Sequence, residues 1–269
     1  MSLAEKLSRS YLQTNSPGWL RPTGARRAKS PPLHYLGMSW GLARLDTHVY
    51  IDGFNLYYGL LKVNPHKWLN LERFCDQLLP KNNVIKIYYF TAKVDARAND
   101  PDQPTRQQAY LTALGTLPRV EIEYGTFMTN AVSQPLLALN ATGRFIRSGG
   151  KPVLQYQPNG TATKAWVLKS EEKGSDVNLA AYLMRDAYQG NCQCAVIVSN
   201  DSDLLTPIRM VKADCGMVIG LAPPREKGSV ELRALADFSV QPRPHHLTSS
   251  QFASPLVIDG NDLHKPASW

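Results

Sequence analysis

Four aspartates occupy positions from which side chains could do chemistry. Asp52 ends a short apolar segment, Asp201 and Asp203 follow a strongly apolar run, and Asp176 opens an amphipathic helical pattern. Asn55 lies one helical turn beyond Asp52. Carboxylate and carboxamide oxygens are hard ligands that suit Mg²⁺ or Mn²⁺, ions that keep several waters and bridge to phosphates. An ion held there would make bound water nucleophilic and neutralise phosphoryl charge, which is the chemistry of phosphodiester hydrolysis.

Each of these acids also has a simpler explanation. An Asp or Ser after a strand commonly caps the next helix, because its oxygen accepts bonds from free N–H groups. Ser175, Asp176, Ser199 and Asp201 all fit that role. Acids from three separate segments at one sheet edge would, however, repel one another and raise each other's pKa unless a cation held them. The combination favours a metal site, while capping stays open for each residue alone.

Other catalytic and ligand-binding motifs are absent from the sequence. It contains no GxSxG, GxxxxGK[ST] or GxGxxG pattern. A Ser-His-Asp triad has no context, since His48 precedes a strand and His66 lies in a proline-containing loop. Four cysteines without zinc-type spacing are too few for a disulfide framework, and Cys192 and Cys194 adjoin an apolar run. We expect buried thiols in a reduced, cytoplasmic protein.

The segments that would position the aspartates alternate between strand and helix patterns. Short β-branched or aromatic runs predict strands, and apolar residues three and four apart predict helices. The expected strands are 48–51, 84–90, 120–127, 195–198 and 217–221, and the expected helices are 54–62, 69–79, 105–117, 176–188, 204–212 and 230–235. This alternation is typical of parallel βαβ units in an α/β domain of three layers. Ligands in such sheets bind beyond the carboxyl ends of strands, where these aspartates stand.

Residues 129–170 interrupt the alternation and predict an inserted β-hairpin or lid. Two strand-like runs, 153–156 and 163–168, flank the turn signal Gln157-Pro-Asn-Gly160. The insertion mixes cations with aromatic rings, a composition typical of a surface that binds single-stranded nucleic acid. The residues expected to contact substrate there are Arg144, Arg147, Lys151 and Trp166. A solvated hairpin without a ligand would have a similar composition, so both interpretations stay open.

Length and charge limit the organisation of the chain. Its 269 residues are 43% hydrophobic and can build a core of one large domain, which we place at 45–240. The net charge is +8, but residues 1–44 account for +6 of it and predict a flexible basic extension. A start-site artefact before Met38 and a transit-like peptide are alternatives for this extension. We expect residues 241–269 to form an irregular tail, and no apolar run is long enough to span a membrane.

Three blocks of sequence carry a family resemblance. They read Tyr50-Ile-Asp-Gly-Phe-Asn-Leu-Tyr57, Glu172-Lys-Gly-Ser-Asp-Val-Asn-Leu-Ala180 and Val198-Ser-Asn-Asp-Ser-Asp-Leu204. In this order they resemble the signature blocks of the NYN domain, a family of the PIN-like nuclease superfamily. The resemblance covers residues 46–240. One departure is Asn200, where the family usually has glycine; asparagine tolerates positive φ better than most residues.

The resemblance implies a Rossmann-like α/β/α sandwich with a mainly parallel sheet and an acidic pocket for Mg²⁺ or Mn²⁺. The residues that match the family's metal site are Asp52, Asp176, Asp201 and Asp203, with Asn55 as their polar companion. Lys173, which precedes a glycine as in matching relatives, is expected to meet phosphate. Ser199 and Asn200 would shape the turn that presents the last two acids.

The leading hypothesis is a metal-dependent ribonuclease acting on single-stranded RNA. Asp52, Asp176 and Asp203 would ligate the metal directly and Asp201 directly or through water, and Asn55 would orient a ligand or the scissile phosphate. The products would carry a 5′-phosphate and a 3′-hydroxyl. The alternatives are an RNA-binding or regulatory module with an inactive pocket and, on the same scaffold, a hydroxylase of small aromatic acids. The sequence leaves the oligomeric state open.

Overall fold

The fold is built around a six-stranded parallel sheet in the computed structural model, which describes residues 44–269 apart from Ala98 and Lys227. Its strands are β1 (Asp46–Asp52), β2 (Asn83–Thr91), β3 (Val120–Tyr124), β8 (Cys194–Val198), β9 (Val218–Leu221) and β10 (Phe238–Ser239). They lie in the order β10-β9-β8-β1-β2-β3, with every neighbouring pair parallel. All but β10 were predicted. The basic extension expected at 1–44 lies, except for Arg44, outside the described residues.

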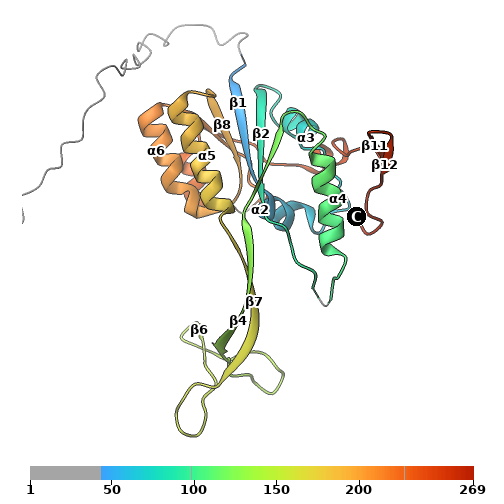
Figure 1. Ribbon diagram of the computed structural model, residues 1–269. Helices are drawn as coiled ribbons and strands as arrows, with labels where there is room; N and C mark the ends of the chain where they lie inside the picture. The colour runs from blue at the N-terminus through green and yellow to red at the C-terminus, as the bar shows by residue number, and fades with distance from the viewer. Residues whose placement is uncertain (1–43, 98, 227) are drawn as a thin grey trace, which may run out of the picture. The chain divides into compact units, whose positions relative to one another are not determined.

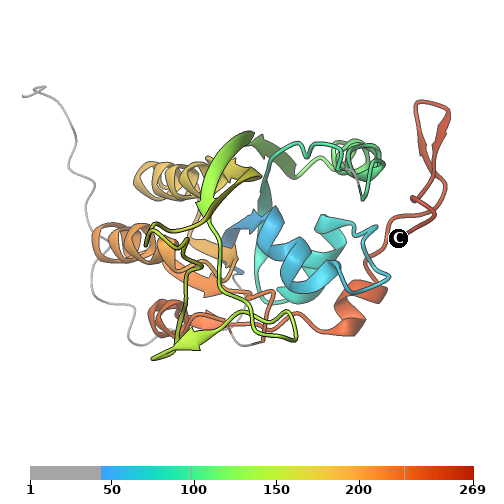
Figure 2. The ribbon, with the colours of Figure 1, turned by 90° about the horizontal axis from the view of Figure 1, so that it is seen from below.

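Helices cover both faces of the sheet (Figures 1 and 2). They are α2 (Gly53–Leu56), the π-helix η1 (Tyr57–Leu61), α3 (Leu71–Leu78), α4 (Gln103–Leu114), α5 (Ser175–Gln189), the 3₁₀ turn η2 (Ser202–Leu204), α6 (Leu205–Cys215) and α7 (Val230–Leu235). Apolar residues of α3 and α4 pack on one face and those of α5, α6 and α7 on the other. Strands β1 and β8 are buried on both sides, which is why their sequences are nearly continuous apolar runs. The predicted three-layer α/β/α fold is confirmed.

An antiparallel hairpin, called the arm below and comprising residues 126–173, is inserted between β3 and α5. Its long strands are β4 (Thr126–Pro135) and β7 (Lys164–Lys173), paired over their whole length, and the short pair β5 (Arg147–Ser148) and β6 (Lys151–Pro152) follows further out. The inserted hairpin was predicted, but its main partner for 163–168 is β4 rather than 153–156. Figure 1 shows the arm leaving the sheet on the side where β1 leads into α2.

The C-terminal segment packs on the domain, in contrast to the irregular tail expected at 241–269. It contains α8 (Pro244–Thr248), β11 (Leu256–Ile258) and β12 (Asn261–Leu263). Leu247 and Phe252 are buried, and the Trp68 indole donates a hydrogen bond to the carbonyl of Ala253 at 3.0 Å. Its few apolar residues have no regular spacing in the sequence. Only their burial against the core shows that the segment belongs to the folded domain. In the described part of the chain, no helix has the length and hydropathy to cross a bilayer.

Candidate functional site

The direction in which the chain adds strands to the sheet reverses between β1 and β8. From β1 the chain moves outward to β2 and β3 on one side, and from β8 it moves outward to β9 and β10 on the other. Ile51 pairs with Val198, so the carboxyl ends of these strands lie side by side. Such a switch point is where open α/β sheets bind ligands, because the loops after the two strands diverge and leave a crevice. Asp52, Asp201 and Asp203 all follow these two strand ends.

Asp52 is held by three hydrogen bonds at the end of β1. Its Oδ1 accepts the backbone N–H of Asn55 at 2.9 Å, and its Oδ2 accepts Asn55 Nδ2 at 2.5 Å and Ser199 Oγ at 3.1 Å. Asp52 is 3% exposed. Burial raises the pKa of Asp52, the bonds from Asn55 and Ser199 oppose the rise, and the charge of Asp201 adds to it. Asp52 thus caps α2, as the simpler explanation allows, and is fixed in orientation as well.

Asn55 links the turns after the two central strands. Its Nδ2 binds Asp52, while its Oδ1 accepts the backbone N–H of Asn200 at 3.3 Å. Asn200 uses no left-handed backbone, since the only non-glycine residue with positive φ in the described chain is Asp259. The Asn200 side chain instead packs against Gly228, where an added Cβ would lie 2.5 Å from Asn200 Oδ1. With both amide ends engaged, Asn55 positions Asp52.

The turn after β8 presents the next two acids differently. The backbone N–H of Asp201 donates to Ser199 Oγ at 3.0 Å, and Asp201 Oδ1 accepts the N–H of Asp203 at 2.9 Å. Asp201 therefore caps η2 and is partly committed to the turn. Asp203 is exposed. Of the acids in this turn, Asp203 has the carboxylate better placed to meet an external group.

Asp176 lies in the first turn of α5, the helix that follows the arm. Gly174 has φ +98°, a left-handed conformation that favours glycine, and turns the chain from β7 into α5. The backbone N–H of Ser175 donates to Glu172 Oε1 at 3.0 Å, which fastens the start of this helix to the arm. Asp176 follows Ser175 and is half-buried.

The pKa of Asp176 is raised by burial and by the other predicted acids, which lie near enough for their charges to act on it. Burial has the largest effect, and with the negative charges of the neighbouring carboxylates it brings the pKa to about 6. Those neighbours are Asp52, Asp201, Glu172 and Asp203. The fold thus brings the four aspartates expected from the sequence to one edge of the sheet. Glu172 is an additional acid that sequence reasoning did not place there.

The donor chemistry of the acidic cluster (Asp52, Asp176, Asp201 and Asp203) fits a hard divalent cation. All four side chains offer oxygen, and their mutual repulsion is what a cation would relieve. Ser175, which precedes Asp176, is 2% exposed, and its hydroxyl has no hydrogen-bond partner among the described residues. This hydroxyl could bind a water molecule of the ion's hydration shell. Within the described residues, however, no three His, Cys, Asp or Glu side chains are close enough to form a ready ligand group. The cluster is more open than a closed metal shell.

The residues expected to contact substrate all lie on the arm and are exposed. They are Arg144, Arg147, Lys151, Trp166 and Lys173. Trp166 is 76% exposed. The Arg147 guanidinium lies over the Phe145 ring at 5.0 Å, and Lys173 forms an ion pair with Glu171 at 3.2 Å. Lys173 is three residues from Asp176, whereas the other four residues lie further out along the arm.

Sequence reasoning missed the part that Ser199 plays in holding a carboxylate. It assigned this residue to the shape of the turn, but the hydroxyl also bonds Asp52, 147 positions away in the chain. A serine directly after a buried strand was the available signal, and it did not distinguish a cap from a bridge between strands. An aromatic pocket beside Gly53 was missed too, because its walls come from distant segments.

A comparison with protein families agrees with the resemblance found in the sequence. A family model described as NYN domain matches residues 46–241. The chain is 31% identical over 252 residues to 6-hydroxy-3-succinoylpyridine 3-monooxygenase HspA of Pseudomonas putida, covering 84% of this chain and 75% of that protein. A crystal structure of a Vibrio parahaemolyticus protein of unknown function matches with a TM-score of 0.43 at 16% identity, covering 75% of this chain and 94% of the other. The chain belongs to the NYN domain family.

Proposed function

We propose that this protein is a metal-dependent ribonuclease. The observation that carries the proposal is the convergence of four aspartates at the switch point of the sheet, where burial and the charges of the other acids raise the pKa of Asp176 to about 6. A protein gains nothing in stability from such repulsion, so the cluster is better explained by a cation. NYN domains belong to a PIN-like, generally nuclease-like family, which supports RNA as the substrate.

The residues would take distinct parts in this reaction. Asp52, Asp176 and Asp203 would hold Mg²⁺ or Mn²⁺ directly, and Asp201 directly or through a water. Asn55 and Ser199 would fix the Asp52 carboxylate, since both donate hydrogen bonds to its Oδ2. A divalent ion, when bound, supplies an activated water and neutralises charge on the phosphoryl group. The four acids repel the phosphate backbone, so contacts elsewhere must bring RNA to the site.

The arm would supply those contacts. Its residues 126–173 carry six Lys or Arg and two Glu, a net charge of +4. It begins directly after β3 and returns directly into α5, whose first turn holds Asp176. A strand of RNA bound along the arm would therefore be led to the acidic cluster by cations attracting its phosphates and by rings stacking on its bases.

The first experiment is cleavage of labelled single-stranded RNA with Mn²⁺. We expect cleavage by the wild type, none in EDTA, and a loss of about 10²–10³-fold in Asp203→Asn, because removing one charged ligand costs several kcal/mol and each 1.4 kcal/mol is tenfold in rate. Asp203 is exposed, so the variant should fold normally. Asp262→Asn, an exposed acid of β12, is the matched control and should cleave like the wild type.

Two results would contradict the proposal. Equal cleavage by wild type and Asp203→Asn would show that the acidic cluster is not the catalytic site. Absence of cleavage with every divalent metal, together with absence of thermal stabilisation by Mn²⁺, would leave an RNA-binding or regulatory module with an inert pocket.

Trp166→Ala should weaken RNA binding through lost stacking. A base stacked on an aromatic ring contributes about 1–3 kcal/mol, so Kd should rise about 5- to 150-fold. Leu168→Ala is the matched control. Leu168 is 79% exposed, lies two residues from Trp166 on β7 and therefore on the same face of the strand, and has no aromatic ring. Fluorescence anisotropy with a labelled single strand measures both. Equal weakening by the two variants would show that general apolar contact, not stacking, holds the RNA.

Oxygenation of a small aromatic compound is a second candidate, favoured by the name of the Pseudomonas putida relative. It would consume O₂ and a reductant, which RNA hydrolysis does not. Oxygen uptake with 6-hydroxy-3-succinoylpyridine and NADH separates the two functions. Uptake dependent on the protein, without RNA cleavage, would replace the ribonuclease proposal by this one.

A further inference from the structure

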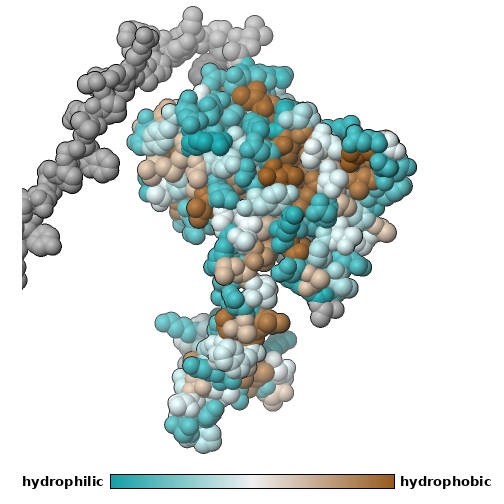
Figure 3. Space-filling model, viewed as in Figure 1, coloured by the Kyte–Doolittle hydropathy of each residue, from teal (hydrophilic) through white to brown (hydrophobic). Residues whose placement is uncertain are grey.

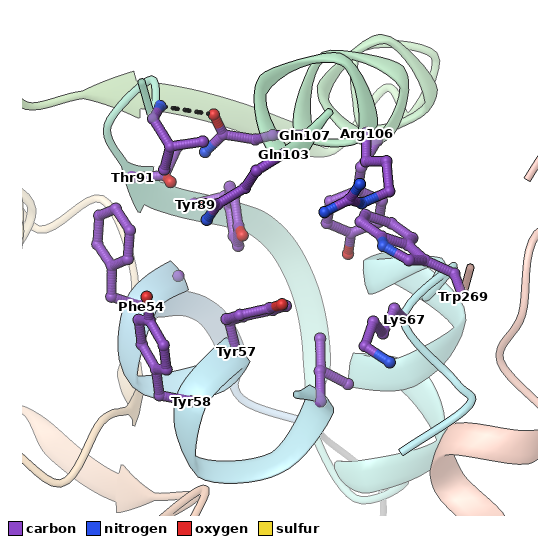
Figure 4. A pocket seen from close by; sticks show the side chains of 14 residues that line it. Phe54, Tyr57, Tyr58, Lys67, Tyr89, Thr91, Gln103, Arg106, Gln107 and Trp269 are labelled. Carbon is purple, nitrogen blue, oxygen red and sulfur yellow. Dashed lines mark hydrogen bonds between the residues drawn. The ribbon is translucent and has the colours of Figure 1, made fainter. Parts of the chain in front are cut away.

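A pocket with aromatic walls lies beside the acidic cluster, between η1, α4 and the C-terminal segment. Its volume is about 70 Å³, room for several waters at roughly 10–15 Å³ each, and it is open to solvent on one side. Figure 4 shows the rings of Phe54, Tyr57, Tyr58, Tyr89 and Trp269 around it, and Tyr110 also lines the pocket. Gly53 also lines the pocket, directly after Asp52 in the chain.

The inner wall of the pocket is rigid. Tyr89 and Tyr110 are buried and meet edge to face, with ring centroids 6.3 Å apart. Tyr110 meets Trp269 in the same way at 5.8 Å, and its hydroxyl donates to the carbonyl of Leu69 at 2.9 Å. Rings fixed by one another and by hydrogen bonds form a preorganised surface, so a planar ligand could pack there with little ordering cost.

Positive charge at the pocket is only partly compensated. Arg106 Nη2 donates to both carboxylate oxygens of Asp100, at 2.7 and 2.6 Å, and this ion pair neutralises and fixes Arg106. Lys67 donates to the carbonyl of Asn64 at 2.8 Å, and in the described chain neither Lys67 nor Lys265 has an ion pair with an acid. Burial lowers the pKa of Lys67, and the charge of Lys265 lowers it further, so the two ammonium groups are close enough to repel. A bound anion would relieve this repulsion.

One polar side chain reaches into the pocket from above. Gln103, in the first turn of α4, extends toward Tyr89 (Figure 4). Its neighbour Gln107 is already engaged, donating to the carbonyl of Ala92 and accepting from the N–H of Val94, both at 2.9 Å. The side-chain amide of Gln103 can therefore form a hydrogen bond with a hydroxyl or ring nitrogen of a ligand. The amide of Gln107 cannot, because it is already bonded to the protein.

We propose that this pocket binds a single-ring aromatic carboxylate. The ring would pack against Tyr57, Tyr89 and Tyr110, the carboxylate would face Lys67, and Gln103 would bind a polar substituent. The space of about 70 Å³ between the rings has room for one ring, with the opening left for its substituents. Binding needs neither the metal nor RNA cleavage, so this site is independent of the proposed ribonuclease activity, and it would supply the ligand site that the second candidate function requires.

The test is calorimetric titration in EDTA with 4-hydroxybenzoate and three matched probes. We expect 4-hydroxybenzoate to bind with a Kd below 1 mM. Neutral 4-hydroxybenzamide, non-aromatic cyclohexanecarboxylate and uridine monophosphate should each bind at least tenfold more weakly. EDTA removes any contribution from the acidic cluster, so the result does not depend on whether the protein cleaves RNA.

Variants locate the site. Lys67→Met keeps the length of the side chain but removes its charge, and should raise Kd at least tenfold. Lys62→Met is the matched control, because Lys62 is exposed, lies over the Tyr58 ring at 5.1 Å and does not line the pocket; its Kd should stay within twofold. Gln103→Trp, which fills the pocket from the exposed start of α4, should abolish binding even if Lys67→Met folds poorly.

Three results would overturn the proposal. One is no binding of 4-hydroxybenzoate at millimolar concentration. Another is uridine monophosphate binding as tightly as the carboxylate, which would mark a nucleotide site. The third is equal affinity in wild type and Gln103→Trp, which would place the ligand elsewhere.

Discussion

Asp52→Asn is expected to lower the rate of metal-dependent RNA cleavage by about 10²–10³-fold while the free energy of unfolding changes by about 1 kcal/mol or less. The catalytic loss follows from removing the proposed ligand that is most rigidly fixed, at tenfold in rate per 1.4 kcal/mol. Stability changes little because two effects oppose each other. Burial raises the pKa of Asp52 and so disfavours its charged form in the fold, whereas the amide loses the bond that Asp52 accepts from Asn55 Nδ2.

The neutral amide fits most of the same surroundings. Asparagine keeps an acceptor for the Asn55 backbone N–H, and its own NH₂ group can donate to Ser199 Oγ, but that NH₂ group cannot accept the bond from Asn55 Nδ2. Cleavage rates and urea unfolding of the same preparation measure the two effects together. A variant that loses activity only in proportion to lost stability would show that Asp52 is a structural cap without a part in catalysis.

Asp186→Ala is expected to cost about 3–5 kcal/mol of stability with the acidic cluster unchanged. Asp186 is fully buried in α5, and its Oδ2 accepts His48 Nδ1 at 2.9 Å and the Tyr50 hydroxyl at 2.8 Å. Arg185 and Asn191 donate to its other oxygen. Removing one partner of a buried ion pair leaves the other charge uncompensated, which is the costly case.

Chemical denaturation with urea measures this loss. Asp214→Ala is the matched control, since Asp214 is exposed on α6 and accepts one bond, from the Tyr188 hydroxyl at 2.7 Å. An exposed contact of this kind contributes about 1 kcal/mol or less. A loss below 1 kcal/mol in Asp186→Ala as well would mean that the buried network does not stabilise the link between β1 and α5.

The same network predicts how the stability of the protein changes with pH. Burial alone lowers the pKa of His48, but its hydrogen bonds to Asp186 and Cys192 outweigh burial and raise the pKa to about 9. Because the folded pKa lies above the ordinary histidine value of 6.5, this stabilisation is complete below pH 6.5 and is lost as pH rises through about 9. The stabilisation involved is at most about 3.5 kcal/mol, at about 1.4 kcal/mol per pKa unit. The slope between pH 6.5 and 9 should be smaller in Asp186→Ala.

Much of the site could be predicted because parallel strands obey a strong rule. Asp52, Asp201 and Asp203 directly follow apolar runs, and all carboxyl ends of a parallel sheet lie at one edge, so recognising the strands was enough to bring the acids together. The helix of Asp176 was equally clear from its amphipathic pattern. Capping and metal binding could not be separated in this way, since both use the same residue at the same position.

Contacts between distant segments left no pattern in the sequence. The register of β4 with β7, the bridge from Ser199 to Asp52 and the network around Asp186 each join residues more than 25 positions apart. The aromatic pocket is an extreme case, because Trp269 meets Tyr110 only after the C-terminal segment has packed on α3 and α4. Spacing along the chain says nothing about such pairs.

The sequence by itself determined the layers, the family and the edge at which the acids gather, since these depend on local periodicity and on ordered short motifs. The tertiary structure alone decided that β1 and β8 are neighbours, that Asn55 and Ser199 hold Asp52, and that the C-terminal segment closes a pocket. The physical reason is that burial and hydrogen bonding between remote segments depend on shape in three dimensions, and no local propensity encodes which of the possible partners will meet.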